Sequence, residues 1–244
     1  MMRRVVVVAM VLVAAVGIAW AQRVDIFTAL REGSIAAEFR GNGDASVIGV
    51  ITRMPGGPTE VVIPAGSVFR VAQTGHGWNQ VGRGGYGGYG GYGGVGGRSG
   101  YGGYTGGRGG RYGQGGRQGM FGMRSTTTRL AFANTAEVVI PAVCMDYNKP
   151  APTRDDVMVV LPPPERLKRL AAAVDEGGWP QPAVQAAMWA LVNRAPRRAG
   201  EKYLELIIPG RSEAIRQQRA ELMDLARALL QAVGVEAGKL PMFQ

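Results

Sequence analysis

The sequence predicts an α+β fold in which the strands precede the helices along the chain. Three observations predict it: β-branched runs between turn residues before residue 162, a triple proline at 162–164, and helical periodicity after it. Apolar residues make up 46% of the 244 residues and charged residues 19%, so the chain has enough apolar residues to form a buried core. We expect an N-terminal β-sandwich or open barrel, followed by a segment of about three helices.

The first residues have the features of a secretory signal peptide. Arg3 and Arg4 precede an apolar run over 5–20, and Ala19-Trp20-Ala21 matches the small-residue pattern at cleavage sites. We therefore expect residues 1–21 to be removed and the protein to be exported to the periplasm, the cell surface or the medium. The alternative is an uncleaved N-terminal anchor; no later stretch is long and apolar enough to span a membrane. Removal of two arginines lowers the net charge from +10 to +8.

Strand candidates occur in two β-rich halves, residues 22–81 and 123–161. The candidates are 46–52, 60–66, 67–71, 126–133, 137–142 and 157–161. Residues 60–65 and 137–142 share the sequence Glu-Val-Val-Ile-Pro-Ala, which predicts two similar strand ends. Because proline cannot donate a ladder hydrogen bond, it favours the terminus or the edge of a strand.

The helical segment covers residues 162–244. Helices are predicted over 165–174, 183–193 and about 213–233, each from apolar residues that recur at helical spacing. Pro182 suits the first turn of the second helix, and Gly234 is a suitable stop for the third.

Glycine is concentrated between the two β-rich halves, in residues 82–122. This window of 41 residues holds 23 of the 39 glycines, six of the eight tyrosines, five arginines and no acid. Glycine loses much backbone entropy on ordering and the window offers almost no aliphatic side chain to bury, so we predict a flexible insertion. The binding candidates in it are Tyr86, Tyr89, Tyr92, Arg98, Tyr101, Tyr104, Arg108, Arg111, Tyr112 and Arg117.

Tyrosine and arginine spaced by glycine are typical of segments that bind polyanions through charge and stacking. Because export argues against nucleic acid, the first functional hypothesis is an exported, non-enzymatic surface or assembly protein. Its insertion would bind an anionic polymer or the cell envelope, or would self-associate. The alternative is an expanded surface loop without a selected role.

Most catalytic constellations are missing from the sequence. It has one histidine, His76, which suits a turn, and it lacks a G-x-S-x-G nucleophile motif and a phosphate-binding P-loop. One histidine and one cysteine make a metal site improbable, and no cofactor is predicted. A secreted hydrolase is the weakest hypothesis, because it needs carboxylates to converge in a cleft. The candidates for such a cleft are Asp146, Asp155, Asp156 and Glu201.

The single cysteine has a candidate partner. Cys144 and Asp146 form a Cys-X-Asp motif, and Gln185, Ala187 and Trp189 form Gln-X-Ala-X-Trp in a predicted helix. In these two short motifs the chain resembles the thioester domains of surface adhesins from Gram-positive bacteria. It also resembles uncharacterised exported bacterial proteins. The adhesin resemblance implies a β-sandwich with helices, and an internal thioester between cysteine sulfur and glutamine carbonyl that an amine on a ligand attacks.

Carried over by residue, Cys144 would be the thiol and Gln185 the acyl donor. The chain departs from the family pattern at Val143 and Val184, and its separation of 41 residues is shorter than expected for the family. A thioester would satisfy a glutamine on an apolar helix face and protect a thiol in an exported chain. The alternatives are a small buried cysteine with a locally hydrogen-bonded glutamine, or a disulfide between chains.

Overall fold

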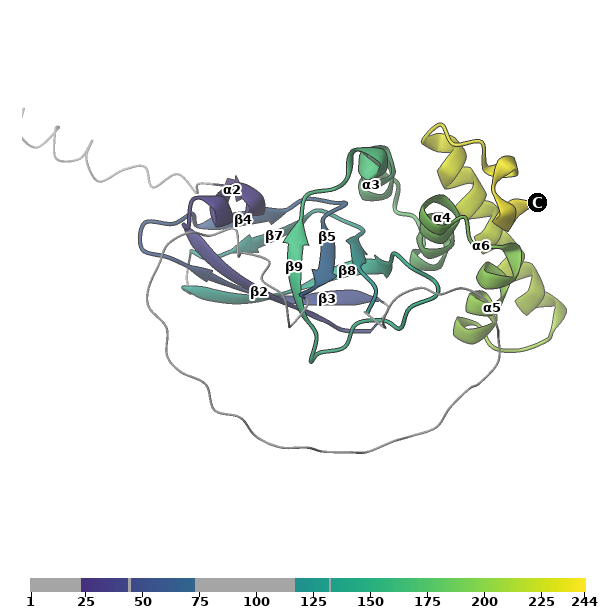
Figure 1. The fold of residues 1–244 in the computed structure, drawn as a ribbon, viewed down its shortest axis with the longest axis horizontal. Coiled ribbons are helices and arrows are strands. Elements are labelled where there is room, and N and C mark those ends of the chain that lie inside the picture. The colour runs from purple at the N-terminus through teal and green to yellow at the C-terminus, as the bar shows by residue number, and fades with distance from the viewer. Residues whose placement is uncertain (1–22, 44, 73–116, 132) are drawn as a thin grey trace, which may run out of the picture.

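The computed structural model describes residues 23–43, 45–72, 117–131 and 133–244. It confirms an α+β fold with a helical C-terminal segment. Strands occupy the left and centre of Figure 1, and most of the helices gather at the opposite end with the C-terminus. The predicted signal peptide lies outside the described residues, and so does the insertion up to residue 116.

A closed barrel of six strands forms the larger sheet, in the order β2-β3-β8-β6-β5-β9. These strands are β2 (Ile35–Gly41), β3 (Ser46–Arg53), β5 (Val68–Val71), β6 (Met120–Gly122), β8 (Thr135–Cys144) and β9 (Val157–Leu161). The strands thus form a closed barrel and not the sandwich or open barrel that the sequence predicted. The ring closes because β9 pairs with β2 through Phe39 and with β5 through Val68–Val71. The sequence pattern of β9 does not indicate that this strand pairs with a neighbour on both sides.

A smaller sheet of three strands, β1 (Arg23–Asp25), β4 (Glu60–Ile63) and β7 (Thr126–Arg129), lies beside the barrel. β1 pairs parallel with β4, and β7 pairs antiparallel with it. The short helix α2 (Ile26–Arg31) follows β1 directly, and the Asp25 carboxylate caps it by accepting from the Phe27 amide at 2.7 Å.

The two copies of Glu-Val-Val-Ile-Pro-Ala lie in different sheets. The first copy forms β4, which ends before Pro64 as predicted from proline chemistry. The second copy lies inside β8, which continues through Pro141 to Cys144. β8 pairs with β3 up to Pro141 and with β6 from Ala142 onward, so the proline stands where the strand changes partner.

Four α-helices make up the C-terminal segment, one more than predicted. They are α3 (Glu165–Gly177), α4 (Gln181–Asn193), α5 (Arg197–Ile207) and α6 (Glu213–Ala232), followed by two 3₁₀ turns at Ala237–Lys239 and Pro241–Phe243. The additional helix, α5, buries only Gly200 and Leu204, although its apolar and polar residues are well segregated. No helix in the described ranges is long and apolar enough to cross a membrane.

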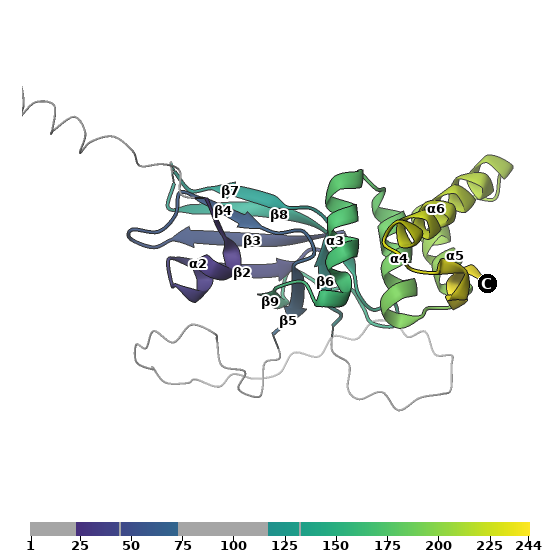
Figure 2. The same cartoon turned by 90° about the horizontal axis from the view of Figure 1, so that it is seen from above.

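Helix α4 is the central helix of this segment and lies between β8 and α6, as both views show (Figures 1 and 2). Its residues from Ala183 to Ala190 are all buried. The core is continuous from the barrel, where the Phe39 and Phe69 rings lie 5.2 Å apart, to this helix. Helix α4 therefore rests on β8 at the end of that strand.

Helix α3 approaches the barrel closely at Gly66, which has a φ of +81°. A Cβ at this position would lie 2.5 Å from the Ala171 Cβ on α3. Gly56 has a similar φ of +77°, but a Cβ there would meet nothing within 4 Å. Alanine at either position would strain the backbone, but only at position 66 would it also clash with α3.

We expect Gly66→Ala to lower the free energy of unfolding by about 2–4 kcal/mol, because backbone strain adds to a clash with α3. Gly56→Ala should cost only about 1 kcal/mol, from backbone strain alone. Urea unfolding of both variants measures the difference. Equal losses would contradict the close packing of α3 at Gly66.

Candidate functional site

The structure brings Cys144 and Gln185 together, although 41 residues separate them. Cys144 is the last residue of β8 and Gln185 lies in the first half of α4, each only 1% exposed. The Gln185 Oε1 accepts from the Cys144 amide at 2.8 Å, and its Nε2 donates to the Cys144 carbonyl at 2.6 Å. The glutamine amide is thus paired with both backbone groups of the cysteine.

The alternation of a β-ladder explains this pairing. The Met145 amide donates to the Gly119 carbonyl at 2.9 Å, so the backbone of its neighbour Cys144 points away from β6. On that other side β3 has already ended, because its first residue, Ser46, pairs with Pro141. Buried backbone groups need partners. The Gln185 side chain provides them where the neighbouring strand is absent.

A second glutamine repeats the arrangement one helical turn earlier. Gln181 Nε2 donates to the Ala142 carbonyl at 2.9 Å and to the Ala45 carbonyl at 3.1 Å. Four helical residues rise about 6.0 Å, close to the roughly 6.8 Å that two strand residues span. Glutamines four apart on α4 therefore match strand residues two apart on β8.

The sulfur of Cys144 lies against β6. Met120 is its cross-strand partner, and the Cys144 Sγ lies 3.6 Å from the Met120 Sδ. Met120 is fully buried, whereas the neighbouring pair Phe121 and Val143 projects from the other face of the sheet. Because Cys144 is only 1% exposed, water is excluded from its sulfur.

The loop after Cys144 is held by a third glutamine, Gln118, which is 5% exposed. Its Oε1 accepts from the Asp146 amide at 2.9 Å, and its Nε2 donates to the Lys149 carbonyl at 2.9 Å. The Asp146 carboxylate accepts from the Asn148 amide and pairs with Lys149 Nζ at 3.1 Å. Asp146, the acid of the Cys-X-Asp motif, thus fixes its own turn.

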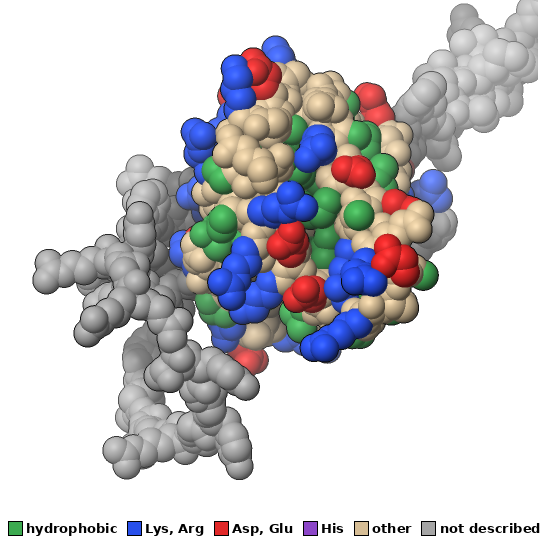
Figure 3. Space-filling model, turned by 90° about the vertical axis from the view of Figure 1, so that its right-hand side faces the viewer, with side chains coloured by type: hydrophobic (Ala, Val, Ile, Leu, Met, Phe, Trp, Pro, Cys, Tyr) green, Lys and Arg blue, Asp and Glu red, His purple; other side chains and the backbone are tan. Residues whose placement is uncertain are grey.

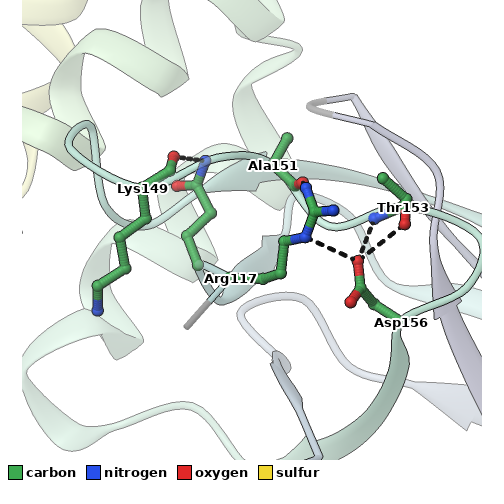
Figure 4. Close-up of polar contacts among 6 residues, drawn as sticks. Arg117, Lys149, Ala151, Thr153 and Asp156 are labelled. Atoms are coloured by element: carbon green, nitrogen blue, oxygen red, sulfur yellow. Dashed lines mark hydrogen bonds and ion pairs between the residues drawn. The ribbon is translucent and has the colours of Figure 1, made fainter. Parts of the chain in front are cut away.

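Arg117 precedes this glutamine and is held by the same loop (Figure 4). Its Nη1 donates to the Ala151 carbonyl at 3.0 Å, and its Nε lies 3.3 Å from the Asp156 carboxylate. Asp156 also accepts from the backbone amide and the hydroxyl of Thr153. The Thr153 amide and hydroxyl, with the charge of Arg117, lower the pKa of Asp156 against the opposing effect of burial. The ionised carboxylate therefore contributes to the stability of the fold above the usual pKa of an aspartate, and this contribution is lost as the pH falls through the lowered pKa.

Trp189 lies one turn beyond Gln185 in an aromatic cluster. Its ring is 6.2 Å from Tyr147, which follows β8, and 5.1 Å from Tyr203 on α5. Its Nε1 is buried without a partner among the described residues, and so is the Asn193 Oδ1 one turn later. Ala187, the remaining motif residue, is fully buried in the core.

The other predicted groups do not converge. Asp146 and Asp156 serve the loop after β8, Glu201 pairs with Arg197 within α5, and Asp155 is exposed. The described residues contain no cluster of three side chains that would suit a metal ion. His76 and the insertion's predicted binding residues from Tyr86 to Tyr112 lie outside the described part of the chain.

The helical end of the molecule carries charges of both signs (Figure 3). Arg197 pairs with Glu201, Arg216 with Glu213, and Lys239 with Glu236. Lysine and arginine are thus interspersed with acids on this face, in contrast to the acid-free insertion.

Comparison with protein-family models, curated proteins and solved structures finds no match for this chain.

Gln118, Gln181 and Met120 were missed as site residues by sequence reasoning. A usable signal existed for Gln181, because it lies four residues before Gln185 on the same helix. None existed for the other two, since only the pairing of β6 with β8 brings them to Cys144.

We expect Gln185→Leu to lower the free energy of unfolding by about 2–4 kcal/mol, because a buried donor and a buried acceptor lose their partners. Gln181→Leu should cost only about 1 kcal/mol, since its contacts are nearer to solvent and replaceable by water. Urea unfolding of both variants tests this order. A reversed order would contradict the role of Gln185 at the strand end.

Proposed function

We propose that the protein is an exported binding protein that attaches covalently to an amine-bearing ligand through a Cys144–Gln185 thioester. One observation carries the proposal: the side-chain amide of Gln185 is held by the backbone of the residue that bears the thiol. The Cys144 N–H donates to Oε1, and this bond withdraws electrons from the amide carbon that the sulfur would attack.

The chemistry requires no oxidant or cofactor. The Cys144 sulfur bonds to the Gln185 side-chain carbon, the carbon–nitrogen bond breaks, and the thiol proton leaves with nitrogen as ammonia. A ligand amine then attacks the same carbon, the carbon–sulfur bond breaks, and the sulfur regains a proton. The product is an amide between the ligand and the Gln185 side chain.

Burial supports this chemistry in two ways. With both residues 1% exposed, a thioester there would be shielded from hydrolysis. Fixed positions on β8 and α4 also make the attack intramolecular, which replaces an encounter between separate groups by preset geometry. Met120 supplies an apolar neighbour on the β6 side of the sulfur.

The test is the intact mass of the protein purified without added amines. A thioester predicts a mass lower by one ammonia, and addition of methylamine should convert it to a species heavier by one methylamine. Cys144→Ala should have the full mass and take up no methylamine.

Unmodified Cys144 and Gln185 in the native protein, with full mass and a titratable thiol, would exclude the thioester. The two residues would then have only the structural role of joining α4 to β8. Gln185→Glu is the matched variant, because it keeps the size of the side chain but lacks an amide that can leave as ammonia.

A second candidate function is binding of an anionic polymer by the insertion. Two observations favour it: the window holds five arginines and no acid, and the described residues that flank residues 73–116 are held beside one point of the body. The Ala72 amide donates to the Val157 carbonyl at 2.8 Å, and Arg117 pairs with the adjacent Asp156. The body would therefore present this segment from a fixed base next to the Cys144 loop.

Deletion of residues 82–116, which spares Arg117 and β6, should leave the body folded. It should strongly weaken binding to immobilised heparin, which serves as a polyanion probe, because four of the eight net positive charges of the mature chain are removed. The control is replacement of the four deleted arginines by glutamine in the full-length insertion. Unchanged binding by both proteins would refute a role of the insertion in polyanion binding.

A further inference from the structure

We propose that Trp189 and Asn193 on α4 bind one buried water molecule, which accepts a hydrogen bond from the Trp189 indole and donates one to the Asn193 side-chain carbonyl. Two atoms carry the proposal: the Trp189 Nε1 and the Asn193 Oδ1 are both buried without a hydrogen-bond partner among the described residues. One is a donor and the other an acceptor. The proposal goes beyond the function proposed above and does not depend on the thioester.

The indole of Trp189 has little access to bulk water, since the residue is only 9% exposed. Buried polar groups in proteins are nearly always bonded to protein or to ordered water, because an unpaired one is strongly unfavourable. The other tryptophan in the described ranges follows this rule, since the Trp179 Nε1 donates to the Ala173 carbonyl at 3.0 Å. Trp189 therefore needs an acceptor that the described residues do not supply.

Ring contacts prevent the indole from turning toward a different acceptor. The centroid of the Trp189 ring lies 6.2 Å from that of Tyr147 and 5.1 Å from that of Tyr203. Because these rings belong to the loop after β8 and to α5, rotation of the indole would require one of these elements to shift in a close-packed interior. The direction of the N–H group is thus fixed by packing, and its partner must come to it.

The spacing of the two residues suits a single bridging molecule. Trp189 and Asn193 are four residues apart, so their side chains lie on one face of α4 with Cβ atoms about 5–6 Å apart. Side chains on a helix lean toward its N-terminus, which brings the Asn193 carboxamide toward the turn of Trp189. A molecule that bonds to both atoms at about 2.9 Å can bridge a separation of up to about 6 Å.

The polarity of the two atoms selects the ligand. The indole N–H disfavours a cation and the amide oxygen disfavours an anion, so the ligand must be neutral. It must also accept and donate through one small group, which is the chemistry of a hydroxyl. Because both atoms are buried, the ligand must be small, and a buried water typically makes about two to four hydrogen bonds to such groups. Water meets each of these requirements.

The water site stands at the corner where α4 turns into α5. Helix α4 ends at Asn193, and the amides of Arg194 and Ala195 both donate to the Trp189 carbonyl. The backbone of Trp189 therefore closes the turn, while its ring packs against Tyr203 on α5. A water between Trp189 and Asn193 would add a polar bridge across the last turn of α4 at the same residue.

The experiment detects the water by NMR on the isotopically labelled full chain. Magnetisation transfer from water to the Trp189 indole proton should give NOE and ROE cross-peaks of opposite sign, which a long-lived bound water produces and simple proton exchange does not. Trp189→Phe assigns the signal, because the cross-peaks disappear with the indole. The Trp179 indole proton, bonded to the Ala173 carbonyl, is the internal control and should show no such pair of cross-peaks.

Asn193→Leu removes one partner of the water and keeps the approximate size of the side chain. It should abolish the cross-peaks at Trp189 and raise the unfolding equilibrium constant about tenfold, because the indole loses its bonded water. In the Trp189→Phe background the same substitution should raise this constant only about twofold, since the water is already lost. Urea unfolding measures the constants, and Asn193→Ala makes the same test if Asn193→Leu does not fold.

Absence of the water cross-peaks at the Trp189 indole of the native chain would overturn the proposal, and this is the result expected if Asn193 bonds to the indole directly. Cross-peaks that persist at full strength in Asn193→Leu would also overturn it. Equal effects of Asn193→Leu in the native and Trp189→Phe backgrounds would do the same, because the two side chains would then act independently. A native chain without a thioester leaves all of these results unchanged, so the two proposals fail separately.

Discussion

The packing of the helical segment on the barrel depends on the buried edge of β8 that has no neighbouring strand after β3 ends. Beyond Pro141 the strand continues for three residues. The Ala142 amide still donates to the Ala45 carbonyl, but the Ala142 carbonyl and both backbone groups of Cys144 face the side on which β3 has ended. Buried without partners, these groups would cost several kcal/mol, about 1–3 kcal/mol each. Helix α4 satisfies them with Gln181 and Gln185, so the helical segment and the barrel are joined by polar contacts in an otherwise apolar interface.

The Gln185 amide has a structural role and a proposed chemical role. It completes the edge of β8, and it is the group that the proposed thioester would use. A leucine at position 185 would fit the apolar interior but leave the Cys144 backbone unpaired, which is why a polar residue belongs there on either interpretation. The cysteine, in contrast, supplies only its backbone to the contact with Gln185, and its sulfur contacts Met120.

Periodicity identified the elements with strong patterns and missed those that depend on distant partners. Of the predicted helices, α3 and α6 carry apolar stripes and α4 is buried on all sides, whereas α5 was missed although its apolar and polar residues are segregated. Closure of the barrel could not be predicted, since it follows from β9 pairing on both sides. The resemblance to thioester domains paired Cys144 with Gln185; the contact found joins the glutamine amide to the cysteine backbone, and the thioester stays a prediction. Gln118 could not be found, because β6 lies within the glycine-rich window where no packed element was expected.

The common base of the insertion has a consequence for its length. The chain leaves the barrel at Ala72 and returns at Arg117, and both residues contact the adjacent pair Asp156 and Val157. The separation of the two ends is thus set by the body and does not depend on how many residues lie between them. A change in the number of residues between Ala72 and Arg117 therefore leaves both anchoring contacts, and the barrel that provides them, unchanged.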